Sequence, residues 1–176
     1  MAVDNTLGRR FDVDAPDKAW VTDITYIKTV EGFGYLAVVI GLRSRRVIGW
    51  SIQSRQTTKV VLQALHRAVW HRRPKTRVLI HSDQGSQFTS IEWASFLRRH
   101  DLEPSMSRRG NCHDNAVAES FFNLLKRERI RRWTYRTRGR GPPGCVRLYR
   151  DVLQSHAQTR QERDAVTRLG RRLITL

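Results

Sequence analysis

Apolar and β-branched residues occur in short runs along the first third of the chain, and these runs predict strands. Residues 20–28 combine β-branched and aromatic side chains, a composition typical of strands. Residues 35–42 are nearly all apolar, which indicates a strand covered on both faces. Residues 47–52 follow after a short turn. Three strands joined by such short links predict an antiparallel meander.

The apolar spacing then changes from strand-like to helical. Thr57 and Thr58 can cap a helix that continues to about Trp70. Its apolar positions share one helical face and should lie on the sheet: Val61, Ala64, Leu65, Ala68 and Val69. A buried strand at 77–82 follows through this helical connection and should therefore run parallel to the first strand.

A second helix is predicted from a cap at Ser90 to about His100, with Ile91, Ala94 and Leu97 facing inward. A weak final strand at 102–107 follows it. The order strand-strand-strand-helix-strand-helix-strand-helix predicts an α/β fold with a five-stranded mixed sheet flanked by helices. Residues 1–18 are polar and form an irregular N-terminal arm, and the predicted core spans 19–138.

The last predicted helix begins after a loop rich in glycine and asparagine. On a helical wheel its apolar stripe contains Val117, Ala118, Phe121, Leu124 and Leu125. The opposite side carries Glu119, Asn123 and Lys126, with Phe122 between the two faces. A carboxylate and a lysine above a buried stripe can face a metal ion and a phosphate together.

Three acidic residues occupy positions that suggest chemistry. Asp23 lies inside a strand, Asp83 follows the end of another, and Glu119 lies on the polar face of the last helix. If the two strands are neighbours, the three carboxylates meet above the sheet. Carboxylates that close repel one another unless cations are present. Mg²⁺ or Mn²⁺ is expected, because two such ions can hold the attacking and leaving oxygens of a phosphoryl transfer.

Two of these carboxylates, and the net charge, also have a simpler interpretation. Asp23 could lie on a sheet edge and face water, and Asp83 could be an ordinary turn residue. The net charge of +17, from 33 Lys/Arg against 16 Asp/Glu, could be a solvated basic surface. Charge this one-sided is better explained by a nucleic-acid partner.

The composition also bears on location. No apolar run is long enough to cross a membrane, and the N-terminus has no secretory pattern. Two cysteines form neither a disulfide framework nor a four-ligand zinc set. We therefore expect a cytoplasmic protein without a membrane partner.

Three segments together resemble a known family. They read WVTDITYI at 20–27, HSDQGSQF at 81–88 and DNAVAESFF at 114–122, and thirty-five residues lie between Asp83 and Glu119. This pattern resembles the integrase catalytic core of the DDE transposases. It is most similar to bacterial insertion-sequence transposases related to retroviral integrases, and the resemblance covers about residues 5–138.

The resemblance implies an RNase H-like fold and assigns Asp23, Asp83 and Glu119 as catalytic ligands of two Mg²⁺ or Mn²⁺ ions. It implies cutting that leaves a DNA 3′-hydroxyl, joining of that hydroxyl to target DNA, and a homo-oligomeric active complex associated with the bacterial nucleoid. Lys126 would contact the end of the element. The candidate DNA-binding residues are Arg108, Arg109, Asn111, Asn115, Asn123, Lys126 and Arg127.

The chain departs from the family pattern at both ends. The DNA-binding helix-turn-helix region that precedes the core in such proteins is expected to be absent or encoded elsewhere. Residues 139–176 begin with glycine and proline and contain eight Arg and no Lys. Shifting the reading frame of this segment by one nucleotide permits a family-like sequence, so we expect an out-of-frame translation. The alternative is a divergent basic tail that binds DNA.

The leading interpretation is therefore a transposase core that could be an inactive remnant. Two alternatives remain: a non-catalytic DNA-binding fragment or regulator of an intact transposase, and an RNase H-like nuclease.

Overall fold

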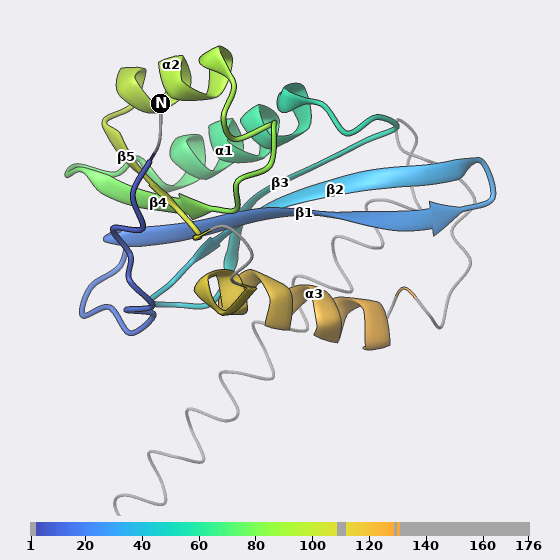
Figure 1. Cartoon of the computed structure of the whole chain (residues 1–176), viewed down its shortest axis with the longest axis horizontal. Coiled ribbons are helices and arrows are strands. Elements are labelled where there is room, and N and C mark those ends of the chain that lie inside the picture. Colours follow the sequence, from blue (N-terminus) through green and yellow to red (C-terminus); the bar gives the residue numbers. More distant parts are fainter. Residues whose placement is uncertain (1–2, 109–111, 129, 131–176) are drawn as a thin grey trace, which may run out of the picture.

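The structure, a computed structural model, describes residues 3–108, 112–128 and 130 of the chain. The elements follow the predicted order: β1 (Ala19–Thr29), β2 (Gly32–Gly41), β3 (Val47–Gln53), α1 (Thr58–Arg72), β4 (Val78–Ser82), α2 (Ile91–Arg99), β5 (Leu102–Met106), the 3₁₀ turn η1 (Cys112–Asn115) and α3 (Ala116–Glu128). Helices α1 and α2 cover one face of the sheet and α3 covers the other (Figure 1). The predicted five-stranded sheet with flanking helices is confirmed.

The sheet has the strand order β3-β2-β1-β4-β5. β1, β2 and β3 form the predicted antiparallel meander, and β4 runs parallel to β1. The pairing of β1 with β4 covers Ala19–Val21, whereas its pairing with β2 continues to Thr29. Asp23 therefore lies two residues beyond the end of the β1–β4 pairing. At this position β1 still pairs with β2 on one side but no longer with β4 on the other.

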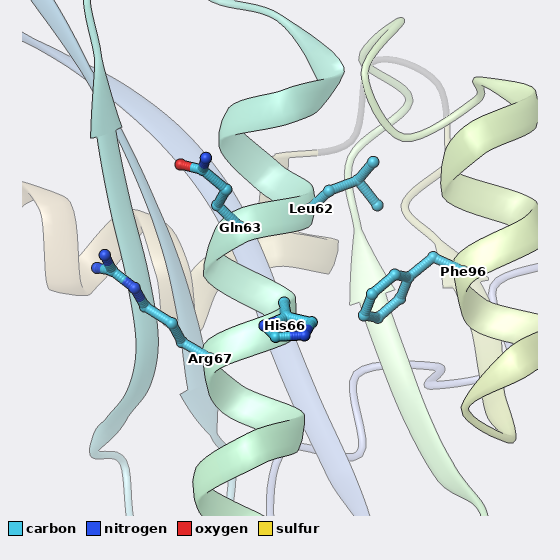
Figure 2. A pocket seen from close by; sticks show the side chains of 5 residues that line it. All are labelled: Leu62, Gln63, His66, Arg67 and Phe96. Carbon is cyan, nitrogen blue, oxygen red and sulfur yellow. The ribbon is translucent and has the colours of Figure 1, made fainter.

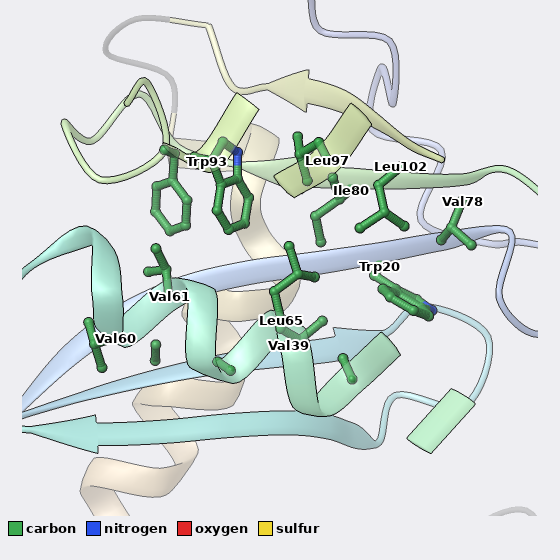
Figure 3. Close-up of a cluster of buried hydrophobic side chains, with 14 of the residues drawn as sticks. Trp20, Val39, Val60, Val61, Leu65, Val78, Ile80, Trp93, Leu97 and Leu102 are labelled. Atoms are coloured by element: carbon green, nitrogen blue, oxygen red, sulfur yellow. The ribbon is translucent and has the colours of Figure 1, made fainter. Parts of the chain in front are cut away.

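The larger core lies between the sheet and helices α1 and α2 (Figure 3). The predicted stripe of α1 is confirmed, since Val61, Ala64, Leu65 and Ala68 are fully buried. Thr57 occupies the N-cap position as expected, but its side chain makes no capping hydrogen bond. Burial of this stripe, and not the cap, is what holds α1 on the sheet.

The predicted inward face of α2 is wrong at two of its three positions. Ile91 is 82% exposed and Ala94 is also exposed, whereas Trp93 and Leu97 are each 2% exposed. Trp93 packs edge-to-face on Phe88, with 5.1 Å between the ring centroids. A nine-residue helix has room for two alternative apolar stripes, and the one that buries the larger aromatic surface is favoured. The predicted cap is confirmed, because Ser90 Oγ accepts a hydrogen bond from the Trp93 amide at 3.2 Å.

On the opposite face, α3 packs against β1 and β2. Phe121, Phe122 and Leu125 are buried with Ile27 and Val38. Phe122, predicted to lie between the two faces of α3, belongs to the buried face. In the part of the chain that the structure describes, no helix is long and apolar enough to cross a membrane.

The tightest contact between sheet and helix is at Gly49 in β3. A Cβ atom there would overlap the Ala64 carbonyl oxygen and lie 2.7 Å from the Ala68 nitrogen. Both are backbone atoms of α1, so neither can rotate away. We predict that Gly49→Ala lowers the free energy of unfolding by about 3 kcal/mol, measured by urea denaturation.

Gly41→Ala is the matched control for this substitution. A Cβ at Gly41 would meet Ser44 Oγ at 3.4 Å and Ile48 Cγ2 at 3.7 Å, which are ordinary contacts. Its unfolding free energy should stay within about 0.5 kcal/mol of the unchanged chain. Equal effects at the two glycines would contradict the account of α1 packing.

Candidate active site

Asp23 lies half-buried on β1, and its Oδ1 accepts a hydrogen bond from the Ile24 amide at 2.7 Å. Burial raises the pKa of Asp23 to about 7, although the Ile24 amide acts in the opposite direction. The charges of Asp83 and Glu119 raise this pKa further, and the Lys126 ammonium lowers it. Asp83, Glu119 and Lys126 thus lie within electrostatic range of Asp23.

Asp83 directly follows β4, where the chain leaves the sheet in a tight turn. Its Oδ1 accepts a hydrogen bond from the Gly85 amide at 2.9 Å, and the Gly85 carbonyl accepts one from the Phe88 amide. Glu119 lies on the first turn of α3 and is partly exposed. The three carboxylates therefore come from a strand, a turn after a strand and a helix, as the sequence predicted.

The unused oxygens of this group have the chemistry of a site for a hard cation. Within residues 3–108 and 112–128, no hydrogen bond is found to Oδ2 of Asp23, to Oδ2 of Asp83 or to the Glu119 carboxylate. Carboxylate oxygens are the donors that divalent cations such as Mg²⁺ prefer. The three groups do not, however, form a cluster tight enough to hold a metal among the described residues.

The predicted DNA contacts have different surroundings. Asn123 and Arg127 are exposed on α3, and Lys126 is half-buried with its ammonium 5.1 Å from the Tyr26 ring centroid. Asn115 is only 4% exposed, and its Oδ1 has no hydrogen-bond partner in the described part of the chain. Arg108 pairs with Asp114. Arg109 and Asn111 lie outside the described residues.

Sequence reasoning assigned no role to Asp114. Its side chain is fully buried, and it accepts hydrogen bonds from Asn5, Arg9 and Arg108. The Arg108 guanidinium, followed by Arg9, holds the pKa of Asp114 well below its usual range. An acidic residue just before a helix suggests only a local cap. The ion pair with Arg9 joins residues more than a hundred positions apart, and no local sequence pattern predicts such a contact.

His81 is a buried residue that links neighbouring strands. Its Nδ1 lies 2.9 Å from Ser105 Oγ and its Nε2 lies 3.1 Å from Ser107 Oγ. Burial lowers the pKa of His81. Two neutral hydroxyl partners suit a neutral imidazole. Through these contacts His81 connects β4 to Ser105 of β5 and to Ser107, which follows that strand.

A separate groove of about 430 Å³ lies between α1 and α2 and is lined by Leu62, Gln63, His66, Arg67 and Phe96 (Figure 2). None of the three carboxylates lines it. The helices that line it, α1 and α2, lie on the face of the sheet opposite α3, so the groove is no part of the carboxylate site.

The mixed five-stranded sheet, with carboxylates on β1, after β4 and on α3, agrees with the class of protein that the sequence resembles, the integrase catalytic cores. Residues 13–112 match the family model described as the integrase core domain, and the chain belongs to this family. It is 46% identical over 127 residues to the transposase InsF for insertion sequence IS3A of Escherichia coli (strain K12), covering 72% of this chain and 44% of the relative.

A second relative is the transposase for insertion sequence element IS904 of Lactococcus lactis subsp. lactis (strain IL1403). It is 44% identical over 134 residues, which cover 76% of this chain and 53% of the relative. The chain thus spans about half the length of these curated relatives.

Solved structures confirm the RNase H-like fold. One is the simian T-cell lymphotropic virus intasome in complex with a PP2A regulatory subunit, with a TM-score of 0.64 and 19% identity over 77% of this chain and 48% of that chain. Another is the HTLV-2 integrase catalytic core domain in complex with magnesium, in its dimeric form. Its TM-score is 0.53, with 20% identity over 65% of this chain and 70% of that chain.

The ionisation of Asp23 gives a pH-dependent prediction. Its pKa is about 7 in the folded chain against an ordinary 3.8, so the folded state holds this proton more tightly than the unfolded state. The stability associated with the protonated form is complete below about pH 4 and is lost as the pH rises through 7. Asp23→Asn cannot ionise and still offers an oxygen to the Ile24 amide.

We predict that the difference in unfolding free energy between Asp23→Asn and the unchanged chain shifts in favour of the variant between pH 4.5 and 8, by on the order of 3 kcal/mol. Urea denaturation in a chelating buffer measures it. Asp101→Asn, on an exposed turn, controls for the loss of one charge. A constant difference across this pH range would argue against a raised pKa of Asp23 in the folded chain.

Proposed function

We propose that this chain is the catalytic core of a DDE-type transposase, which cuts donor DNA and joins the resulting 3′-hydroxyl to target DNA by metal-dependent phosphoryl transfer. The observation that carries the proposal is the electrostatic coupling of Asp23 to both Asp83 and Glu119, which come from three separate elements. The transposase relatives, at 44–46% identity, support the same activity.

Asp23, Asp83 and Glu119 are the residues that would hold the metal, proposed as two Mg²⁺ or Mn²⁺ ions. When bound, such ions neutralise charge on the transferred phosphoryl group and orient its attacking and leaving oxygens. The chemistry of the donor set fits, because each carboxylate has an oxygen without a hydrogen-bond partner among the described residues, and a cation would offset the repulsion that Asp83 and Glu119 exert on Asp23. The HTLV-2 integrase core, a fold neighbour, is in complex with magnesium.

The surrounding side chains would hold the DNA. Lys126 lies near Asp23 and is in contact with Tyr26, which limits its freedom and keeps its ammonium beside the carboxylates. Asn123 and Arg127 on the exposed side of α3 extend this polar surface. The net charge of +17 supports a DNA partner. Dimeric and trimeric forms of the HTLV-2 core support a homo-oligomeric active complex.

A non-catalytic DNA-binding fragment, able to regulate an intact transposase, is the second candidate. The net charge of +17 suits DNA binding whether or not the carboxylates are catalytic, so it supports this candidate as well. The proposed out-of-frame segment, residues 139–176, lies outside the described residues. Sequencing the encoding DNA from codon 138 and translating the neighbouring frame tests that part of the proposal.

Replacing one carboxylate separates catalysis from DNA binding. We predict that Asp83→Asn lowers Mg²⁺-dependent strand transfer by about 10³-fold or more, because a lost metal ligand removes several kcal/mol of transition-state stabilisation. The measurement is a strand-transfer assay on DNA carrying the ends of the element, with binding followed in parallel by fluorescence anisotropy. DNA affinity should change by less than about 2-fold.

Asp101→Asn is again the matched control and should leave strand transfer unchanged. Asp101 has a left-handed backbone, with φ 50°, which asparagine tolerates. If the unchanged chain binds DNA but transfers no strand with Mg²⁺ or Mn²⁺, the regulatory fragment becomes the better interpretation. Cleavage of an RNA–DNA hybrid in place of strand transfer would indicate the nuclease.

Metal binding can be tested without DNA. At a metal concentration about 100-fold above its dissociation constant, one bound ion should raise the unfolding free energy by about 2.7 kcal/mol. We predict that Mn²⁺ raises the melting temperature of the unchanged chain and of Asp101→Asn, and that this increase is largely lost in Asp23→Asn and Asp83→Asn. An equal increase in all four proteins would place the metal elsewhere.

A further inference from the structure

Asp114 is a buried carboxylate with an unusually full set of donors. Arg108 donates to it from Nε at 2.9 Å, from a second guanidinium nitrogen at 3.0 Å and from its backbone amide at 3.0 Å. Asn5 and Arg9 of the N-terminal arm donate from the other side, each at 2.8 Å. A buried carboxylate is stable only with such compensation. The arm thus supplies part of what allows Asp114 to remain buried.

The position of Asp114 makes this network relevant to the active site. Asp114 belongs to η1, which leads directly into α3, and Glu119 lies on the first turn of that helix. Fixing Asp114 from two sides therefore fixes the start of α3. The orientation of the first turn determines where the Glu119 carboxylate is held.

Apolar packing joins the arm to the same turn of α3. Leu7 of the arm is 3% exposed and belongs to one cluster with Val21 of β1 and Ala118 of α3. Ala118 is fully buried and immediately precedes Glu119. This contact is independent of the hydrogen bonds to Asp114, so two kinds of interaction hold α3 against the arm.

The arm also bonds to β5, which pairs with β4, the strand that precedes Asp83. The Leu7 amide donates to Ser105 Oγ at 3.0 Å, and Ser105 Oγ is also the partner of His81 Nδ1. The Asp4 carbonyl accepts a hydrogen bond from the Met106 amide at 3.1 Å. One short segment of the arm is therefore bonded to β5, whose Ser105 contacts His81 of β4, and to Asp114 of η1, which leads to Glu119.

We propose that Asp114 is a positioning residue for Glu119 and that Asn5, Leu7 and Arg9 of the N-terminal arm hold the Asp83 and Glu119 carboxylates in register for metal binding. This inference rests on the proposed function of the carboxylate site. It gives Arg108 a structural role within the loop, in place of the direct DNA contact expected from the sequence. Loosening the arm should weaken the metal site without altering the catalytic residues themselves.

Two neighbouring arginines of the arm provide a matched pair of variants. Arg9 donates to Asp114, whereas Arg10 donates to the Leu7 and Thr6 carbonyls inside the arm. Arg9→Ala and Arg10→Ala remove the same charge one residue apart. Arg9→Lys keeps the charge and can restore one bond to Asp114. These variants avoid Asp114 substitutions, which could prevent folding.

The first readout is amide hydrogen exchange on the full, metal-free chain. Amides of residues 120–122 bond to carbonyls of the first turn of α3. In Arg9→Ala they should exchange about 10-fold faster, while amides within α1 keep their rates. Arg10→Ala should leave both regions unchanged, and Arg9→Lys should lie between. An equal change in α1 and α3, or equal effects of the two alanine variants, would overturn the proposal.

The second readout is Mn²⁺ affinity, measured by calorimetry. Arg9→Ala should raise the dissociation constant by about 10-fold, in the range typical of residues that orient metal ligands, and Arg10→Ala should not. Strand transfer should fall in parallel at subsaturating Mn²⁺ and recover at saturation, with DNA affinity unchanged. A loss that persists at saturating metal would overturn the proposal.

These measurements separate the two proposals. If the unchanged chain shows no strand transfer, the proposed function fails, but the exchange difference between Arg9→Ala and Arg10→Ala still reports whether the arm holds α3. If strand transfer is present and exchange at 120–122 does not respond to Arg9→Ala, the function stands and the positioning role is overturned.

Discussion

The short parallel pairing of β1 with β4 determines where a polar site can form in this fold. The two strands share a ladder over Ala19–Val21, and β4 ends at Ser82. β1 continues beyond that point beside β2 alone, with Asp23 opposite Val38. An ionisable side chain deep inside the ladder would be costly, whereas one just past the end of a neighbouring strand has room for water, cations or substrate. The turn after β4 delivers Asp83 to the same place.

In our proposal the N-terminal arm helps to position Glu119, the third carboxylate, at the site that contains Asp23 and Asp83. α3 lies on the face opposite α1 and α2, and its apolar residues fix its distance from the sheet (Figure 1). Apolar packing alone is non-directional and would leave the helix free to shift along its axis. The directional bonds to Asp114, together with the close packing of Leu7 and Ala118, set the start of the helix.

The sequence predicted those elements whose apolar pattern extends over many positions. The strands of the meander, the stripe of α1 and the buried face of α3 could be predicted because many positions agreed on one periodicity. The face of α2 could not, since Ile91 and Ala94 compete with Trp93 and Phe96 over nine residues, and packing on Phe88 determines the outcome. The arm was predicted to be irregular, which is correct, but its bonds to Ser105 and Asp114 connect residues about a hundred positions apart and leave no local pattern.

Asp23 could be singled out because a carboxylate is unusual inside a strand, and the resemblance to the integrase cores linked it to Asp83 and Glu119. Their surroundings could not be predicted. Half-burial raises the pKa of Asp23, and this depends on how closely α3 and the turn after β4 approach β1. The role of Arg108 depends in the same way on tertiary structure, because its guanidinium turns back to Asp114.

Asp23 and Asp114 have opposite environments. Asp114 is the more deeply buried, but among the described residues Asn5, Arg9 and Arg108 donate hydrogen bonds to it, and its pKa is held low. In the same part of the chain Asp23 accepts one hydrogen bond, from a backbone amide, and two carboxylates raise its pKa more than the Lys126 ammonium lowers it. A carboxylate compensated by the protein itself is structural, because no ligand could improve its environment. A carboxylate that the fold leaves undercompensated is stabilised by protonation or by a cation that binds beside it. On this argument we assign separate roles to the two residues and propose that Asp114 holds the helix and that Asp23 is a metal ligand.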